Sequence, residues 1–229
     1  MSEKELPPPP KPDSADLRHR IEKAIVGTNP VTGAIAELLD VLTPPLERRR
    51  ARWFEQLWEA VAELQQRVKA ITGDALRDNE AFVSAALHAT HIALRNHQLE
   101  KLGALRNAVL NVAAGSAPED DQQIMFLDAV DGLTVSHIAV LKKLVEQDKR
   151  SHQQRIHHHS DAVRPSRAPD DRFAQIIRDL WNRGFVETNV PFDQLHNGTV
   201  GGAHVKLTAY GTEFLDFITS PLEKSGVSA

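Results

Sequence analysis

The sequence of 229 residues lacks cysteine, contains few aromatic residues and has no long uncharged hydrophobic run. Without cysteine it has no disulfide framework, no thiolate metal site and no thiol nucleophile. The longest weakly charged stretch, residues 26–42, is interrupted by Pro30, Glu37 and Asp40, so it is too short and too polar to cross a bilayer. The amino terminus, MSEKELPPPPKP, lacks the apolar core of a signal peptide. We therefore expect a cytoplasmic protein.

Motifs that carry catalysis are also missing. In GTNPVTGA the glycines at positions 27 and 33 do not have the spacing of a phosphate-binding loop, and no lysine follows Gly33. The sequence has no Gly-x-Ser-x-Gly elbow and no evident acid–base pair. These absences predict a protein that is not an enzyme and that has no cofactor.

The first half of the chain predicts helices. Residues 1–16 are rich in proline and predict a disordered tail, whereas residues 17–116 predict a helical bundle. Pro44 and Pro45 are expected to end one helix, capped by Thr32, and to begin another that runs to residue 71. This longer helix carries an apolar seam that fits packing within a bundle or, alternatively, contact between two copies. The seam consists of Leu57, Val61, Leu64, Val68 and Ile71.

Two further helices complete the predicted bundle. Asn79 is expected to cap an alanine-rich helix, and a partner helix is expected over residues 98–113. Gly115 to Pro118 then predict the domain boundary. The expected inward positions of the two helices are Phe82, Ala86, Ala89 and Ala93, followed by Leu99, Leu102, Leu105, Val109 and Val112.

The second half, residues 117–220, predicts three helices followed by a two-stranded ribbon and a closing helix. The helices are expected at 119–130, from a cap at Thr134 onward, and from Asp170 or Asp171 to Gly184, with a polar insertion at 148–171. Residues 185–188 and 205–207 are the candidate strands, and residues 221–229 are expected to be a flexible tail. The predicted fold class is therefore mainly α: a helical bundle followed by a winged-helix-like domain with a small two-stranded wing.

Two resemblances accompany this pattern. The strings FLDAVDGLTVSHIAVLKKL and LWNRGFVE…HVKLTAYGTEFLDFI resemble the winged-helix domains of bacterial regulators. More loosely, PPLERRRARW, KLGALRNAVLN and FLDAVDGLTVSHIAVL are similar to bacterial proteins of the abortive-infection alpha type. The second resemblance implies a role in phage resistance. The winged-helix match is carried by Leu180, Gly184, Phe185, Leu207, Thr208, Gly211 and Leu215.

Candidate residues for binding nucleic acid lie on the third helix of the second half and on the wing. Winged helices place this helix in the major groove. However, residues 119–220 hold 11 lysines and arginines against 15 aspartates and glutamates, a net charge of −4. Asp170, Asp171 and Asp179 would repel phosphates, so weak binding to DNA is expected. The candidates for contact with nucleic acid or a protein partner are Arg172, Arg178, Asn182, Arg183 and Lys206.

A dense arginine run and two histidine groups invite other interpretations. Arg48, Arg49, Arg50 and Arg52 form either a solvated helix face that pairs with acidic neighbours or a contact with an anionic surface. His152 and residues 157–159 predict a solvated polar loop, because consecutive histidines point in different directions. His88 and His91, with Glu100, predict surface or interhelical hydrogen bonding, since the repeated carboxylate ligands of bundle metal sites are missing. No metal site is predicted.

Three hypotheses for function follow. The first is a non-enzymatic protein-interaction module, acting on a protein partner or on a second copy, in stress response or phage defence. The second is a winged-helix DNA-binding regulator, and the third is a membrane-associated effector that acts through residues 26–52. Fold alone does not determine function. We favour protein interaction because the net negative charge of the second half disfavours binding to DNA phosphates.

Overall fold

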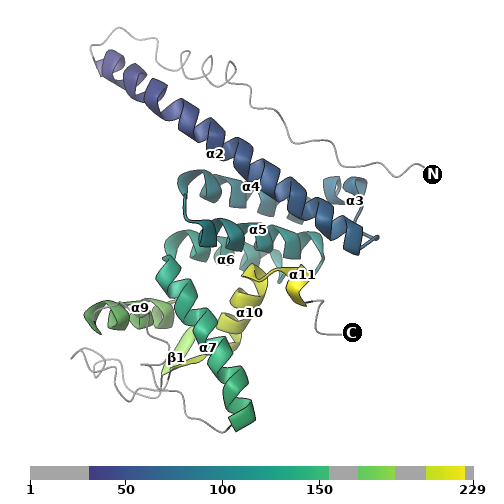
Figure 1. The fold of residues 1–229 in the computed structure, drawn as a ribbon, viewed down its shortest axis with the longest axis vertical. Helices are drawn as coiled ribbons and strands as arrows, with labels where there is room; N and C mark the ends of the chain where they lie inside the picture. Colours follow the sequence, from purple (N-terminus) through teal and green to yellow (C-terminus); the bar gives the residue numbers. More distant parts are fainter. Residues whose placement is uncertain (1–30, 155–169, 189–204, 225–229) are drawn as a thin grey trace. The chain divides into compact units, whose positions relative to one another are not determined.

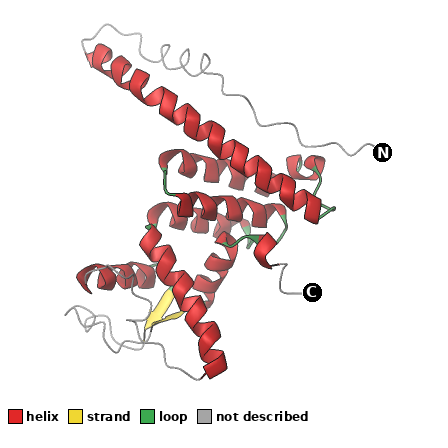
Figure 2. Ribbon diagram, in the orientation of Figure 1, coloured by secondary structure: helices red, strands yellow, loops and turns green. Residues whose placement is uncertain are grey.

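The computed structural model describes residues 31–154, 170–188 and 205–224, which are mainly helical and include one small antiparallel sheet (Figure 1, Figure 2). This confirms the predicted fold class of helices with a two-stranded sheet. The contacts within the chain define two compact units, Met1–His97 and Gln98–Ala229. The predicted tail 1–16, the predicted helix at 17–25, the histidines 157–159 and the tip of the predicted wing all lie outside the described residues.

The first unit contains helices α2 (Val31–Arg67), α3 (Gly73–Arg77) and α4 (Glu80–Arg95). Helices α2 and α4 pack together. Small side chains on α4 allow this close approach, and the predicted Asn79 cap is confirmed, since its Oδ1 accepts a 3.0 Å hydrogen bond from the N–H of Phe82. The buried apolar residues of the unit are Trp53, Leu57, Val61, Leu64, Leu76, Ala85, Ala89, Ile92 and Ala93.

One buried hydrogen bond ties the aromatic end of this core together. The indole N–H of Trp53 donates to the Thr90 hydroxyl at 2.9 Å, and that hydroxyl donates to the carbonyl of Ala86 at 2.7 Å. Because a buried indole N–H without an acceptor costs free energy, Thr90 lets a tryptophan occupy the core.

Helix α2 differs from the prediction in three ways. It begins one residue before Thr32, so this residue lies inside the helix and is not its cap. It is one continuous helix with Pro44 and Pro45 inside it, where the sequence predicts a break. Proline has a helical φ, and two successive prolines remove two backbone donors without reversing the chain direction. The helix also ends at Arg67, so Val68 lies beyond it and is exposed rather than part of the seam.

The second unit contains the remaining described elements, which surround a common apolar core. Helix α5 packs on α6, α10 and α11, whereas α7 packs on α9, α10 and β2. Helix α9 also contacts β1. The elements are α5 (Leu99–Ala113), α6 (Asp120–Gly132), α7 (Val135–Gln154), α9 (Asp170–Asn182), β1 (Val186–Thr188), β2 (Val205–Leu207), α10 (Ala209–Ile218) and α11 (Pro221–Lys224).

Aromatic rings fill the centre of this core. Phe126 lies 5.0 Å from Tyr210 and 5.3 Å from Phe214, measured between ring centroids. Phe185 stacks on Tyr210 with an interplanar angle of 9° and on Phe214 at 4.6 Å. Such ring pairs stabilise a core beyond the area they bury. They fix α6, the start of the ribbon and α10 to one another.

The ribbon confirms the predicted pairing of the two strands. Val186 pairs with Leu207 and Thr188 pairs with Val205, in antiparallel register. Gly184 ends α9 with a positive φ of 77°, a conformation that favours glycine. The Thr208 hydroxyl donates to the carbonyl of Gly184 at 2.6 Å and accepts from the N–H of Gly211 at 2.9 Å, so it joins the ribbon to α10.

The boundary between the units lies earlier than the sequence predicts. The prediction places α5 in the N-terminal bundle and the boundary at 116/117, but the compact units divide between His97 and Gln98. The reason is Asn111, which is fully buried in α5. Its amide donates to the carbonyls of Phe217 and Thr219, each at 2.8 Å, so the carboxyl end of α10 is bonded to α5.

Two segments that the sequence predicts to be irregular are partly helical in the structure. Helix α7 continues to Gln154, into the segment 148–171 that the sequence predicts as a polar insertion. Residues 221–224 of the predicted flexible tail form α11, and Pro221 is buried. Helix α11 packs on α5, which explains why this part of the tail is ordered.

Candidate interaction surfaces

Helix α9 carries most of the residues predicted to contact nucleic acid or a partner. Its apolar side is buried, at Phe173, Ile176, Ile177 and Leu180. Arg172, Asn182 and Arg183 are exposed, Arg178 is half-buried, and Lys206 is exposed on β2. The structure thus places three of these residues on α9, Arg183 directly after its last residue, and Lys206 on the ribbon.

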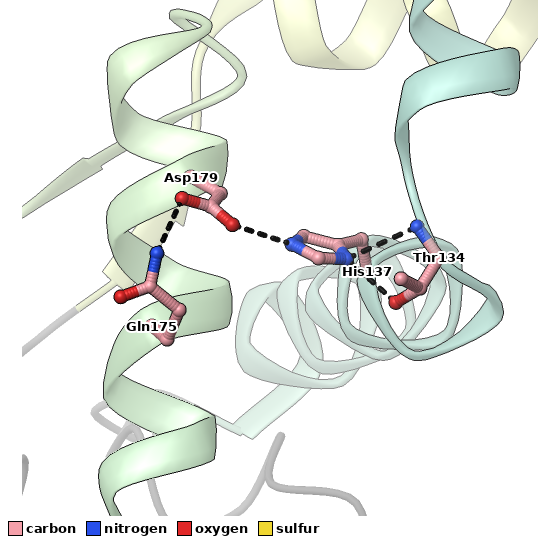
Figure 3. A network of polar contacts seen from close by, with 4 residues as sticks. All are labelled: Thr134, His137, Gln175 and Asp179. Carbon is pink, nitrogen blue, oxygen red and sulfur yellow. Dashed lines mark hydrogen bonds and ion pairs between the residues drawn. The ribbon is translucent and has the colours of Figure 1, made fainter.

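A polar network connects α9 to the beginning of α7 (Figure 3). The Nε2 atom of buried His137 lies 3.5 Å from the Oδ2 atom of Asp179, whose other oxygen accepts a 2.8 Å hydrogen bond from Gln175. On the other side of the ring, Nδ1 lies 3.2 Å from the backbone N–H of Thr134 and 2.7 Å from its hydroxyl. The contact at 3.5 Å is too long for a strong hydrogen bond and is mainly electrostatic.

The network fixes the protonation of His137. The Thr134 N–H can only donate, so Nδ1 must accept and the ring proton sits on Nε2, facing Asp179. Burial lowers the pKa of His137; Asp179 opposes this effect, and the charges of Arg183 and Lys101 add to it. His137 is therefore held in its neutral form. The Thr-x-x-His spacing at 134–137 was the only sequence signal for this network.

More charged groups surround the turn between α6 and α7. Lys101 is buried, and its Nζ donates to the backbone carbonyl of Asp131 at 2.8 Å. Burial lowers the pKa of Lys101, and the charge of Asp131 acts in the opposite direction. The guanidinium of Arg183 lies over Gly132, where a Cβ would come within 2.8 Å of its Nη2. Lys101 and Arg183 both contact the turn between α6 and α7, so we infer that they stabilise it.

The network gives Asp179 a structural role that the sequence does not predict. The sequence alone groups Asp179 with Asp170 and Asp171 as carboxylates that would repel phosphates. In the structure its Oδ2 is directed at His137 (Figure 3), and Arg183 extends toward the α6–α7 turn. One charge on α9, Asp179, and one directly after it, Arg183, therefore make contacts within the unit.

Helix α6 presents an exposed surface that the sequence does not predict. Ile124 is 49% exposed although it is a large apolar residue, and Met125 is 57% exposed. Because each residue turns the helix by about 100°, Ile124 lies on the side opposite buried Phe126. An exposed aspartate lies on each side of this apolar pair, and the four residues have the helical spacing i, i+3, i+4, i+7. We call Asp121, Ile124, Met125 and Asp128 the acidic surface.

Helix α2 presents a surface of the opposite charge. All four arginines of the run at 48–52 are exposed, and the guanidinium of Arg50 lies 5.9 Å from the ring centre of Phe54. Leu42 and Leu46 are 44% and 40% exposed. They lie on the same side of α2 as buried Trp53, because the spacing 42, 46, 49, 53 follows the helical repeat. We call Leu42, Leu46, Arg49 and Arg50 the arginine surface.

The histidines on α4 do not form part of a larger ligand set. His91 is exposed and His88 is half-buried. Within residues 31–154, 170–188 and 205–224, no group of three or more histidine, aspartate or glutamate side chains is arranged to hold a metal ion.

Comparisons with family models, curated proteins and solved structures returned no match. Of the helices that the structure describes, none is by itself long and apolar enough to cross a membrane; α6 and α7 would meet that test only as a pair bent by 118°.

Proposed function

We propose that the chain is a non-enzymatic protein-interaction module and that it binds its partner through the acidic surface of α6. The supporting observation is the exposure of two adjacent large apolar side chains, Ile124 and Met125, between aspartates. Apolar side chains that do not face the core favour a binding role when they cluster. The aspartates favour a partner segment that carries arginine or lysine beside its apolar residues.

The ionisable groups with shifted pKa values favour this proposal over catalysis. In the part of the chain that the structure describes, these are Lys101, His137 and Tyr210. Lys101 donates to a backbone carbonyl, His137 lies between Thr134 and Asp179, and the ring of Tyr210 stacks on Phe185. The charged or polar atoms of Lys101 and His137 face other groups of the unit, so they are poorly placed to meet a substrate.

The cellular setting rests on resemblance. The likeness to the abortive-infection alpha type makes phage defence or stress response the proposed setting, in the cytoplasm. The winged-helix likeness keeps DNA binding as the second hypothesis, with Arg172, Asn182, Arg183 and Lys206 exposed for it and Arg178 half-buried. The exposed arginines of α2 likewise keep contact with an anionic membrane as the third.

The test compares two matched double variants of the immobilised full-length chain. Ile124→Ser with Met125→Ser removes the apolar part of the acidic surface, while Val83→Ser with Leu87→Ser removes exposed apolar residues of α4. We expect wild type and the α4 variant to retain the same proteins from an extract of the native cells, and the α6 variant to lose them. Equal retention by all three folded proteins would contradict the proposal.

A further inference from the structure

The arginine surface of α2 is the uncovered part of a helix face that is elsewhere buried. The side of α2 that contains Trp53 and Leu57 packs in the core of its unit, with α4 against α2. Helix α2 has 37 residues and α4 has 16, so α2 continues beyond its partner (Figure 1). Leu42 and Leu46 lie on this extension of α2 and are 44% and 40% exposed, whereas Thr43 between them is 9% exposed.

The arginine surface and the acidic surface are similar in length. The first extends from Leu42 to Arg50, about 12 Å, and the second from Asp121 to Asp128, about 10 Å, at 1.5 Å per residue. Each covers an arc of about 100° and combines two large apolar side chains with two charged ones. On α6 the aspartates flank the apolar pair, whereas on α2 the two leucines precede the two arginines. Two such helices can pack at a crossing angle that brings the apolar side chains together and places arginine beside aspartate.

Their charges are opposite and favour one pairing. Two acidic surfaces repel each other, as do two arginine surfaces, whereas arginine and aspartate form paired hydrogen bonds with good geometry. One chain thus carries two surfaces that are complementary in charge. The residues of the arginine surface on α2 and of the acidic surface on α6 are all exposed.

We propose that the arginine surface of one copy docks on the acidic surface of a second copy of this chain. A two-fold arrangement uses each surface once in each copy, so the contact occurs twice and the buried area doubles. This inference rests on the proposed function, because it assigns the occupant of the same α6 surface.

The test is a charge exchange measured by sedimentation of the full-length chain. Asp121→Lys with Asp128→Lys makes the α6 surface basic, and Arg49→Glu with Arg50→Glu makes the α2 surface acidic. We expect each variant alone to weaken dimerisation by at least about tenfold, since like charges then face each other. An equimolar mixture should restore the dimer, because each reversed surface then meets an opposite charge. Glu59→Lys with Glu146→Lys, an equal charge change at exposed positions outside both surfaces, should leave the dimer unchanged.

Several results would overturn the dimer. These are a wild type that sediments as a single chain at every concentration, or a mixture of folded variants that stays monomeric. Flotation of a monomeric chain with vesicles rich in anionic lipid, lost in Arg49→Glu with Arg50→Glu, would assign the arginine surface to a membrane instead. A monomeric wild type whose α6 serine variant still loses retained proteins would overturn the dimer but leave the proposed function standing.

Discussion

Replacing Asn111 by alanine should destabilise the second unit strongly, because its amide holds α5 to the end of α10. The side chain is fully buried and donates at 2.8 Å to the carbonyls of both Phe217 and Thr219. The bond to Phe217 is buried and the bond to Thr219 is partly buried. A buried carbonyl that loses its donor costs about 1–3 kcal/mol and a partly buried one costs less, so the expected loss is about 2–4 kcal/mol. That is a large part of the roughly 5–15 kcal/mol that stabilises a typical domain.

Urea unfolding followed by circular dichroism measures this loss as a shift of the transition midpoint. Asn107→Ala is the graded control, since its amide makes one bond, to the carbonyl of Ile218 at 3.0 Å, and it should lose about 1 kcal/mol. Asn182→Ala, at an exposed position of α9, should change stability by less than about 0.5 kcal/mol. An Asn111→Ala loss no larger than that of Asn182→Ala would refute the reasoning and the assignment of α5 to the second unit.

Three further predictions test the core, the network and the DNA hypothesis. Gly211→Ala should unfold the second unit or lower its melting temperature sharply, because the new Cβ would collide with the carbonyl oxygen of Phe185; unchanged melting would refute this contact. The pKa of His137 is lower in the folded state than in the unfolded chain. As the pH decreases, the unfolded chain therefore binds this proton at a higher pH than the folded chain does. The free energy of unfolding should be constant above about pH 6.5 with respect to this group and should fall below that value. His137→Gln should reduce this dependence in urea melts, and an identical slope would contradict the assignment. Finally, fluorescence anisotropy should show no binding of duplex DNA near physiological salt; sub-micromolar binding that is lost on replacing Arg172, Arg178 and Arg183 by alanine would favour the DNA-binding hypothesis instead.

Strongly periodic positions were predictable from the sequence. The buried side of α9 follows from Phe173, Ile176, Ile177 and Leu180, which recur at helical spacing. The pairing of residues 186–188 with 205–207 follows because a short strand needs a partner and few candidates lie nearby. The cap at Asn79 follows from its side-chain chemistry.

Features that depend on distant partners were not predictable in the same way. Leu99 is apolar and in register with its helix, yet it is 72% exposed as the first residue of α5. The two prolines at 44 and 45 predict a break that the structure does not contain. The contact of His137 with Asp179 joins residues from separate helices, so no local pattern predicts it. The three-residue spacing of Thr134 and His137 is a signal only for the contact between those two residues.

Oxidation of Met125 tests the role of the acidic surface most directly. The sequence has two methionines, Met1 and Met125, and the side chain of Met125 is exposed on α6. Limiting peroxide converts exposed methionine to the sulfoxide, and mass spectrometry reads the ratio of oxidised to unoxidised Met125. We expect this ratio to be high for the dilute purified chain and to fall severalfold in an extract of the native cells, where a bound protein covers α6. An unchanged ratio would contradict a protein-binding role for this surface.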